Sequence, residues 1–168
     1  MALKFLMLKT AEKPKASNKG MYINDWNSSF KMKAIPWCAS SMSAWSAEGH
    51  VIKPIVKSAA ARSFRKGTVH SLSEINRNLY VPKPGDYRVK SRRGGNHVDL
   101  IIAWNAKNNS GLLLGGNVSD KVSLRKVTLK SMVGDGTTGI TEVVGNYDYE
   151  ISDSTLKAYV SFYENVSF

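Results

Sequence analysis

Strand-like segments follow one another between residues 97 and 127, and they constrain the fold more than any other part of the sequence. His97–Trp104 has the strongest strand pattern in the chain, and Asn108–Gly111 supplies residues typical of a tight turn. The chain returns through Gly111–Asn117, and Lys121–Val127 then alternates apolar and polar residues with period two. The pattern predicts an antiparallel hairpin extended by a further strand.

The segments before these strands favour helices. A helix is predicted over Pro36–Ala47, a second from a Ser58 cap to Gly67, and a short turn of helix after the capping-box pattern Ser71–Glu74. The polar segment 9–34 is expected to be an irregular arm. Helices followed by an antiparallel meander predict an α+β fold, and 168 residues suit one domain.

The only cysteine, Cys38, falls at the predicted start of the first of these helices. Pro36 precedes it and small residues follow it. A helix N-terminus carries partial positive charge and free N–H donors, which favour a thiolate over a thiol. The alternative interpretation is a small buried thiol that packs as an apolar side chain. A single cysteine also means that the fold contains no internal disulfide.

Charge is unevenly spread along the chain, whose formal net charge is +11. Residues 1–130 hold 23 of the 24 Lys and Arg against 7 acidic residues, whereas residues 131–168 hold 1 against 6. The basic part suits an anionic polymer such as nucleic acid, teichoic acid or the carboxylate-bearing peptidoglycan mesh. Scattered lysines and the lack of a helix-turn-helix, zinc or aromatic-strand motif argue against nucleic acid.

Other classes of partner are not indicated by the sequence. One cysteine and three dispersed histidines lack the paired spacing of zinc ligands, so we expect neither a metal nor a cofactor. No stretch approaches the roughly 20 apolar residues that span a membrane. The apolar start, residues 1–9, is too short for a classical signal peptide and lacks a cleavage site, so we expect it to belong to the mature fold.

Three motifs, taken together and in order, carry a resemblance to a known family. They are Pro36–Ala39 (Pro-Trp-Cys-Ala), the turn Pro84–Asp86 leading to His97-Val98, and Leu114–Val122 with its Gly-Gly-Asn. With these, residues 30–127 resemble the CHAP (cysteine, histidine-dependent amidohydrolase/peptidase) domains and the wider NlpC-type cell-wall hydrolases. The resemblance implies a papain-like fold, in which the cysteine begins a helix packed on an antiparallel sheet that carries the histidine. Residues 128–168 lie outside the resemblance, and their role is open.

The resemblance implies Cys38 as nucleophile, His97 as general base and Asn117 as the residue that orients the imidazole. Asp99 is an alternative third residue, because at period two it lies on the same face of a strand as His97. Candidates for substrate contact are Trp37, beside the nucleophile, and two arginines in the loop before His97. These arginines are Arg92 and Arg93.

The activity implied by the resemblance is hydrolysis of amide bonds in bacterial peptidoglycan by a cysteine amidase or endopeptidase. Such a protein is expected to be made in the cytoplasm and to act on the cell wall, in the periplasm or outside the cell, after delivery or lysis. Phage lysins and delivered antibacterial effectors, such as those of type VI secretion, both fit, and an immunity or delivery protein would then be a partner. The alternative is a non-catalytic wall-binding or phage structural protein on the same fold.

Overall fold

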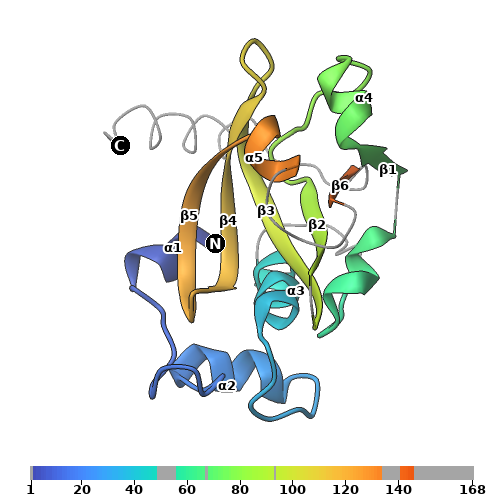
Figure 1. Ribbon diagram of the computed structural model, residues 1–168. Helices are drawn as coiled ribbons and strands as arrows, with labels where there is room; N and C mark the ends of the chain where they lie inside the picture. Colours follow the sequence, from blue (N-terminus) through green and yellow to red (C-terminus); the bar gives the residue numbers. More distant parts are fainter. Residues whose placement is uncertain (1, 49–55, 67, 93, 134–140, 146–168) are drawn as a thin grey trace.

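The computed structural model combines helices with one antiparallel sheet, as expected for an α+β fold (Figure 1). It describes residues 2–48, 56–66, 68–92, 94–133 and 141–145. The helical elements in these ranges are α1 (Ala2–Met7), α2 (Met21–Ser28), α3 (Cys38–Glu48), the 3-10 helix η1 (Ala61–Arg65), α4 (Leu72–Asn76) and α5 (Leu129–Val133).

Six strands form the sheet of the described residues, in the order β1-β6-β2-β3-β4-β5 with every neighbouring pair antiparallel. Their bounds are β1 (Thr68–Ser71), β2 (Tyr87–Arg92), β3 (Gly95–Asn105), β4 (Ser110–Val118), β5 (Lys121–Thr128) and β6 (Thr141–Gly145). The predicted meander is confirmed as β3, β4 and β5, with β2 on its other side. A register shift between Ile101 and Ala103 interrupts the β3–β4 ladder.

Two apolar clusters cover the opposite faces of the sheet. The larger joins α1, α2 and α3 to Val98 and Leu114, and it contains Phe5, Trp26 and other buried aromatic side chains. The smaller joins α4 and α5 to Ile101 and Leu113. Neighbouring strand residues therefore belong to different clusters, as the period of two in a strand requires.

The helix that begins at Cys38 lies where β3 and β4 part. Pairing between these strands begins at Leu100 and Leu114, so residues 95–99 of β3 extend beyond the ladder that they share with β4. Figure 1 shows the two strands diverging toward their lower ends, with α3 beside the gap. Gly116 permits this approach, because a Cβ there would lie 2.9 Å from Trp37 Cζ3 and would overlap the Ser41 hydroxyl. The helix therefore reaches the open edge of β3.

The sequence prediction was wrong in three segments. The expected irregular arm contains α2, whose buried Ile23 and Trp26 pack against the larger cluster. The helix expected after Ser58 is the 3-10 helix η1 instead. Residues 131–139, whose Gly, Asp and Thr are typical of a loop, begin inside α5, which extends to Val133. The capping box is confirmed, since Ser71 and Glu74 hydrogen-bond each other reciprocally at the start of α4. The alternating pattern through Tyr147, Tyr149 and Ile151, and again from Tyr159 to Phe168, predicts further strands, and these segments lie outside the described residues.

Replacing Gly116 with Ala is expected to destabilise the protein by about 1–3 kcal/mol, because the new methyl group pushes α3 away from the sheet. Chemical denaturation measures the effect. Adding Ser41→Ala to Gly116→Ala removes one of the two overlaps and is expected to recover part of the loss, with Ser41→Ala alone as the control. Wild-type stability in Gly116→Ala would contradict this packing.

Candidate active site

Cys38 is the first residue of α3. The amide of Ser41 donates to the carbonyl of Trp37 over 3.0 Å, which makes Trp37 the residue that caps the helix N-terminus. The amides of the first helical turn have no acceptor within the helix, so they remain available to a negative charge at this end. Cys38 is buried, with 3% of its surface exposed, and its thiol interacts with the backbone amide of Val98 at the open edge of β3.

His97 of β3 is the ionisable side chain that acts most strongly on Cys38. Each of the two side chains shifts the pKa of the other toward its charged form. Nε2 of the imidazole is paired with Asp99 Oδ1 at 2.9 Å, so Nδ1 is the nitrogen left for the thiol. Nδ1 is buried and has no hydrogen-bond partner among the described residues. The imidazole thus lies between a carboxylate and a thiol, with one nitrogen for each.

Asp99 is completely buried and holds three basic side chains. Besides His97, Oδ1 accepts from Arg125 Nη2 at 2.8 Å, and Oδ2 accepts from Arg88 Nη1 at 3.3 Å. Arg88 lies directly opposite Asp99 in the β2–β3 register, while Arg125 comes from β5. A buried carboxylate is stable only when its charge is compensated and its lone pairs are used, and these donors meet both needs.

The charges of this cluster favour a thiolate–imidazolium pair. Burial alone would raise the pKa of Cys38, but the neighbouring His97, the Val98 amide and the charge of Arg92 together lower it below its usual value. Burial likewise opposes protonation of His97, yet Asp99 and Cys38 raise its pKa to about 9. Burial also disfavours the Asp99 carboxylate, and His97, Arg125 and Arg88 more than offset this, so its pKa is lowered.

The sign of each shift fixes its effect on stability. The raised pKa of His97 stabilises the folded state below its ordinary value of 6.5, and this contribution is lost as the pH rises through about 9. The lowered pKa of Asp99 stabilises the folded state above its ordinary value of 3.8, and this contribution is lost as the pH falls below that value. The cluster is therefore most stabilising from weakly acidic to neutral pH.

Asp99, the alternative third residue, holds the position beside His97, and Asn117 does not. The amide of Asn117 donates to Asn18 Oδ1 at 3.3 Å, and the residue has a positive φ of 59° at the end of β4. This contact ties the N-terminal arm to the turn between β4 and β5, next to the bridge between Ala11 and Lys121. Asn117 thus makes a structural contact with the N-terminal arm, and Asp99 is the residue that hydrogen-bonds the imidazole.

The residues expected to contact substrate divide into three cases. Trp37 has no exposed surface: its Nε1 donates to the buried Glu12 carboxylate at 2.8 Å, and its ring packs on Trp26 with centroids 5.7 Å apart. It is a core residue, contrary to the expectation. Arg92 is partly exposed at the end of β2 and acts on Cys38 by its charge. Arg93 lies outside the described residues.

Three residues of the cluster escaped the sequence analysis, namely Arg88, Arg125 and Gly115. A Cβ at Gly115 would overlap Asp99 Oδ1 and lie 2.8 Å from Val118 Cγ2. The two neighbouring glycines of the Gly-Gly-Asn motif therefore serve opposite sides of β4: Gly115 leaves room for the Asp99 carboxylate and Gly116 for α3. The motif itself was the available signal, although strand register was needed to interpret it.

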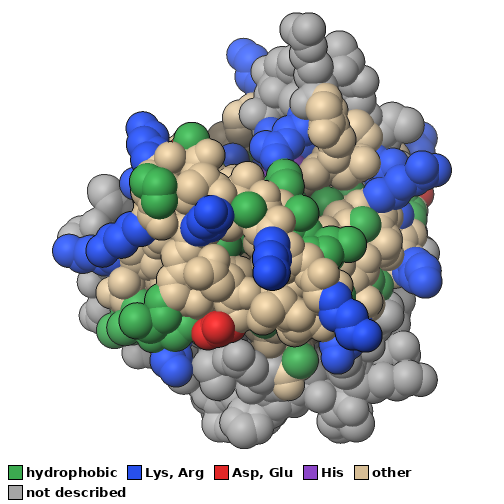
Figure 2. Space-filling view, turned by 90° about the horizontal axis from the view of Figure 1, so that it is seen from below, with side chains coloured by type: hydrophobic (Ala, Val, Ile, Leu, Met, Phe, Trp, Pro, Cys, Tyr) green, Lys and Arg blue, Asp and Glu red, His purple; other side chains and the backbone are tan. Residues whose placement is uncertain are grey.

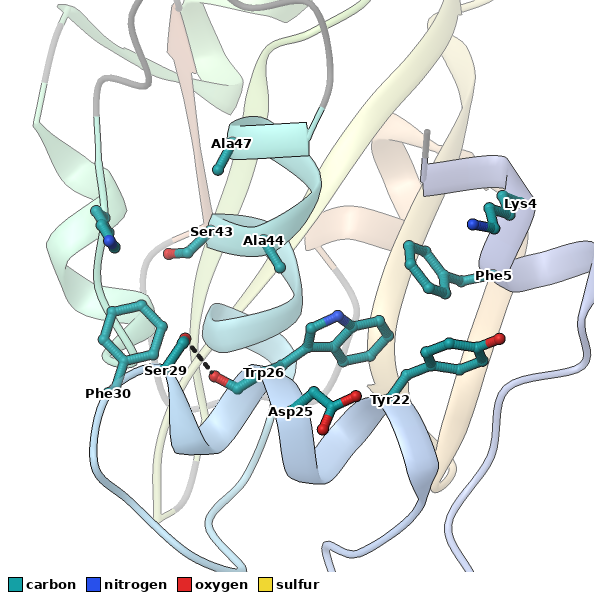
Figure 3. A pocket seen from close by; sticks show the side chains of 11 residues that line it. Lys4, Phe5, Tyr22, Asp25, Trp26, Ser29, Phe30, Ser43, Ala44 and Ala47 are labelled. Carbon is teal, nitrogen blue, oxygen red and sulfur yellow. Dashed lines mark hydrogen bonds between the residues drawn. The ribbon is translucent and has the colours of Figure 1, made fainter.

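A separate pocket of about 460 Å³ lies between α1, α2 and α3 (Figure 3). Phe5 of α1, Tyr22 and Trp26 of α2, and Phe30 just after α2 line one side of it, and Ser43, Ala44 and Ala47 of α3 line the other. None of the cluster residues Cys38, His97 and Asp99 borders it. The pocket is therefore distinct from the thiol–imidazole site.

Among the described residues, no group of three or more His, Cys, Asp or Glu side chains is arranged to hold a metal ion. Within those ranges, every helix is also too short or too polar to cross a bilayer.

Comparison of the chain with models of protein families, with curated proteins and with solved structures found no match. The assignment of a function therefore depends on the geometry of the site and on the residues of the chain itself.

His97→Ala is expected to abolish the reactivity of Cys38 near neutral pH, because burial then acts on the thiol without its main compensating partner. The measurement is the rate of Cys38 alkylation by iodoacetamide as a function of pH, read by mass spectrometry. The wild-type rate should stay high on the acid side of the ordinary thiol pKa, about 8.5. An unchanged pH profile in His97→Ala would contradict the thiol–imidazole pair.

Gly115→Ala is expected to slow Cys38 alkylation more than Gly116→Ala does, because its methyl group displaces Asp99 while that of Gly116 displaces α3. Both substitutions add the same group to adjacent residues of β4, so each controls for the other. Rates should be compared at temperatures where the two variants are equally folded. Equal rates would show that Gly115 has no special relation to the site.

Proposed function

We propose that this protein is a cysteine amidohydrolase or endopeptidase that cleaves amide bonds in the peptides of bacterial peptidoglycan. The observation that carries the proposal is the row of three side chains in which Asp99 holds the His97 imidazole beside the Cys38 thiol at a helix N-terminus. A nucleophile, a base and a group that orients the base are the parts that acyl transfer through a cysteine requires. A papain-like fold, with the helix packed on the sheet, belongs to the same proposal.

The reaction follows from the charge state of the pair. The Cys38 thiolate attacks the carbonyl carbon of the amide, and free amides of the first turn of α3 stabilise the oxyanion that forms. The His97 imidazolium gives its proton to the leaving amine as the C–N bond breaks, which leaves a thioester on Cys38. Water then attacks the thioester while neutral His97 takes a proton from it, and collapse of the adduct releases the acid product and restores the Cys38 thiolate and the His97 imidazolium.

The charge of the surface supports an anionic substrate. Figure 2 shows the lower face of the molecule, where Lys and Arg side chains among the described residues are spread widely and acidic side chains are scarce. Arg92 adds a positive charge close to Cys38. A carboxylate-bearing peptide mesh would be attracted to such a surface, and the attraction would weaken at high salt. The place of action would be the bacterial cell wall, reached by phage lysis or by delivery as an antibacterial effector.

One observation favours a second candidate, a wall-binding or phage structural protein that kept the arrangement without turnover. Cys38 and His97 expose 3% and 2% of their surface, which is little for groups that must meet a substrate. Binding without hydrolysis would need no access to the thiol. The two candidates differ in whether Cys38 is required for release of products.

Digestion of purified peptidoglycan distinguishes them. Wild-type protein is expected to release soluble muropeptides, and Cys38→Ala to release none above background. Asp99→Asn should lower the rate on the order of 100-fold because the imidazole loses its ionised partner, whereas Asn117→Ala should keep most of the activity. Mass analysis of the products identifies the bond that is cut. Equal release by wild type and Cys38→Ala would favour the binding protein.

A further inference from the structure

We propose that Arg125 of β5, together with Arg88 of β2, is a positioning residue that clamps the Asp99 carboxylate, and that this clamp sets the pH range in which the Cys38 thiol is reactive. The inference rests on the proposed function, because it treats Cys38, His97 and Asp99 as the reacting group and its supports. It adds two residues from other strands and assigns them a task.

The clamp fixes the orientation of the carboxylate. Asp99 Oδ1 accepts from both His97 Nε2, at 2.9 Å, and Arg125 Nη2, at 2.8 Å, while Oδ2 accepts from Arg88 Nη1 at 3.3 Å. Any rotation of the carboxylate that released His97 would also break a charged hydrogen bond to an arginine. Such bonds are about twice as strong as neutral ones. The arginines thus hold Oδ1 where the imidazole needs it.

The clamp extends from β2 to β5, and the absence of a side chain at Gly115 of β4 makes this possible. Arg125 lies on β5 and Asp99 on β3, so the arginine must reach past β4, which lies between them. Any side chain at Gly115 of β4 would overlap Asp99 Oδ1. Arg88 is buried, with 1% exposed, whereas the Arg125 side chain is 30% exposed. Arg125 is therefore the member of the clamp that can be changed with least damage to the core.

The two guanidinium groups supply more charge than Asp99 needs. Around the thiol and imidazole, β2 contributes three basic residues, β3 the single carboxylate, and β5 one arginine. These charged neighbours are Arg88, Lys90 and Arg92 on β2, Asp99 on β3, and Arg125 on β5. Net positive charge stabilises a thiolate and destabilises an imidazolium. Removing the positive charge of Arg125 should therefore raise the pH at which the thiol ionises. Removing the charge of Asp99 should raise it as well, because the imidazolium that stabilises the thiolate is then lost.

The test is the pH profile of Cys38 alkylation by iodoacetamide in the full-length protein, measured for four variants. Arg125→Gln removes the charge but keeps a donor for Oδ1, and Arg125→Lys keeps the charge but loses the planar fork. Asp99→Asn removes the opposite charge. Arg77→Gln, at an exposed arginine after α4, is the matched control. Thermal unfolding of each variant confirms that it is folded.

The profile of Arg125→Gln is expected to move up by about one pH unit, the size that a unit charge several ångströms away produces at the effective dielectric of a protein. Asp99→Asn should also move it up, because the imidazolium that stabilises the thiolate loses its partner. Arg125→Lys should restore most of the Arg125→Gln shift, and Arg77→Gln should not move the profile. An Arg125→Gln profile that superimposes on the wild type or moves down, or an Arg125→Lys profile displaced as far as that of Arg125→Gln, would overturn the clamp. If Asp99→Asn does not fold, the Gln and Lys variants of Arg125 decide.

Failure of this inference can be told apart from failure of the proposed function. Alkylation reads the thiol directly and needs no hydrolysis. An upward shift in Arg125→Gln that Arg125→Lys largely restores, without muropeptide release by the wild type, would support the clamp and reject the hydrolase. Muropeptide release that depends on Cys38, with an unshifted Arg125→Gln profile, would support the hydrolase and reject the clamp.

Discussion

The charge of Asp99 is the constraint on which the arrangement of the site depends. A fully buried carboxylate is costly to hold unless every lone pair is used, and removing one partner of such a pair typically costs about 3–5 kcal/mol. Here the partners come from three strands: His97 from β3, Arg88 from β2 and Arg125 from β5. The interactions that compensate this one carboxylate therefore link β2, β3 and β5 to the imidazole.

The approach of Cys38 depends on a second constraint, the parting of β3 and β4. Because the ladder between them begins only at Leu100 and Leu114, the edge of β3 near His97 is open to the first turn of α3. Gly116 removes the side chain that would keep α3 away, and Gly115 removes the one that would displace Asp99. Cys38 and His97 come together because Gly115 and Gly116 place no side chain on either face of β4.

Periodicity and capping chemistry predicted much of this from the sequence. The meander from His97, the helix at Cys38 and the capping box at Ser71 were all visible as local patterns, and period two placed Asp99 on the face of His97. The remaining features depend on non-local contacts. Arg88 and Arg125 are unremarkable strand residues until register sets them against Asp99, and Trp37 could be placed in the core only once Glu12 was found bonded to its indole. The segment with α2 looked polar because Lys, Ser and Asn dominate residues 9–34, which obscured the helical i, i+3 spacing of Ile23 and Trp26.

The central claim is that Cys38 and His97 exist as a thiolate–imidazolium pair held by Asp99. The most direct measurement is the ultraviolet absorbance of the thiolate during a pH titration, recorded as the difference between the wild-type protein and Cys38→Ala. The account predicts a thiolate signal already present at neutral pH that disappears on acidification. A signal that appears only above the ordinary thiol pKa, about 8.5, would contradict it.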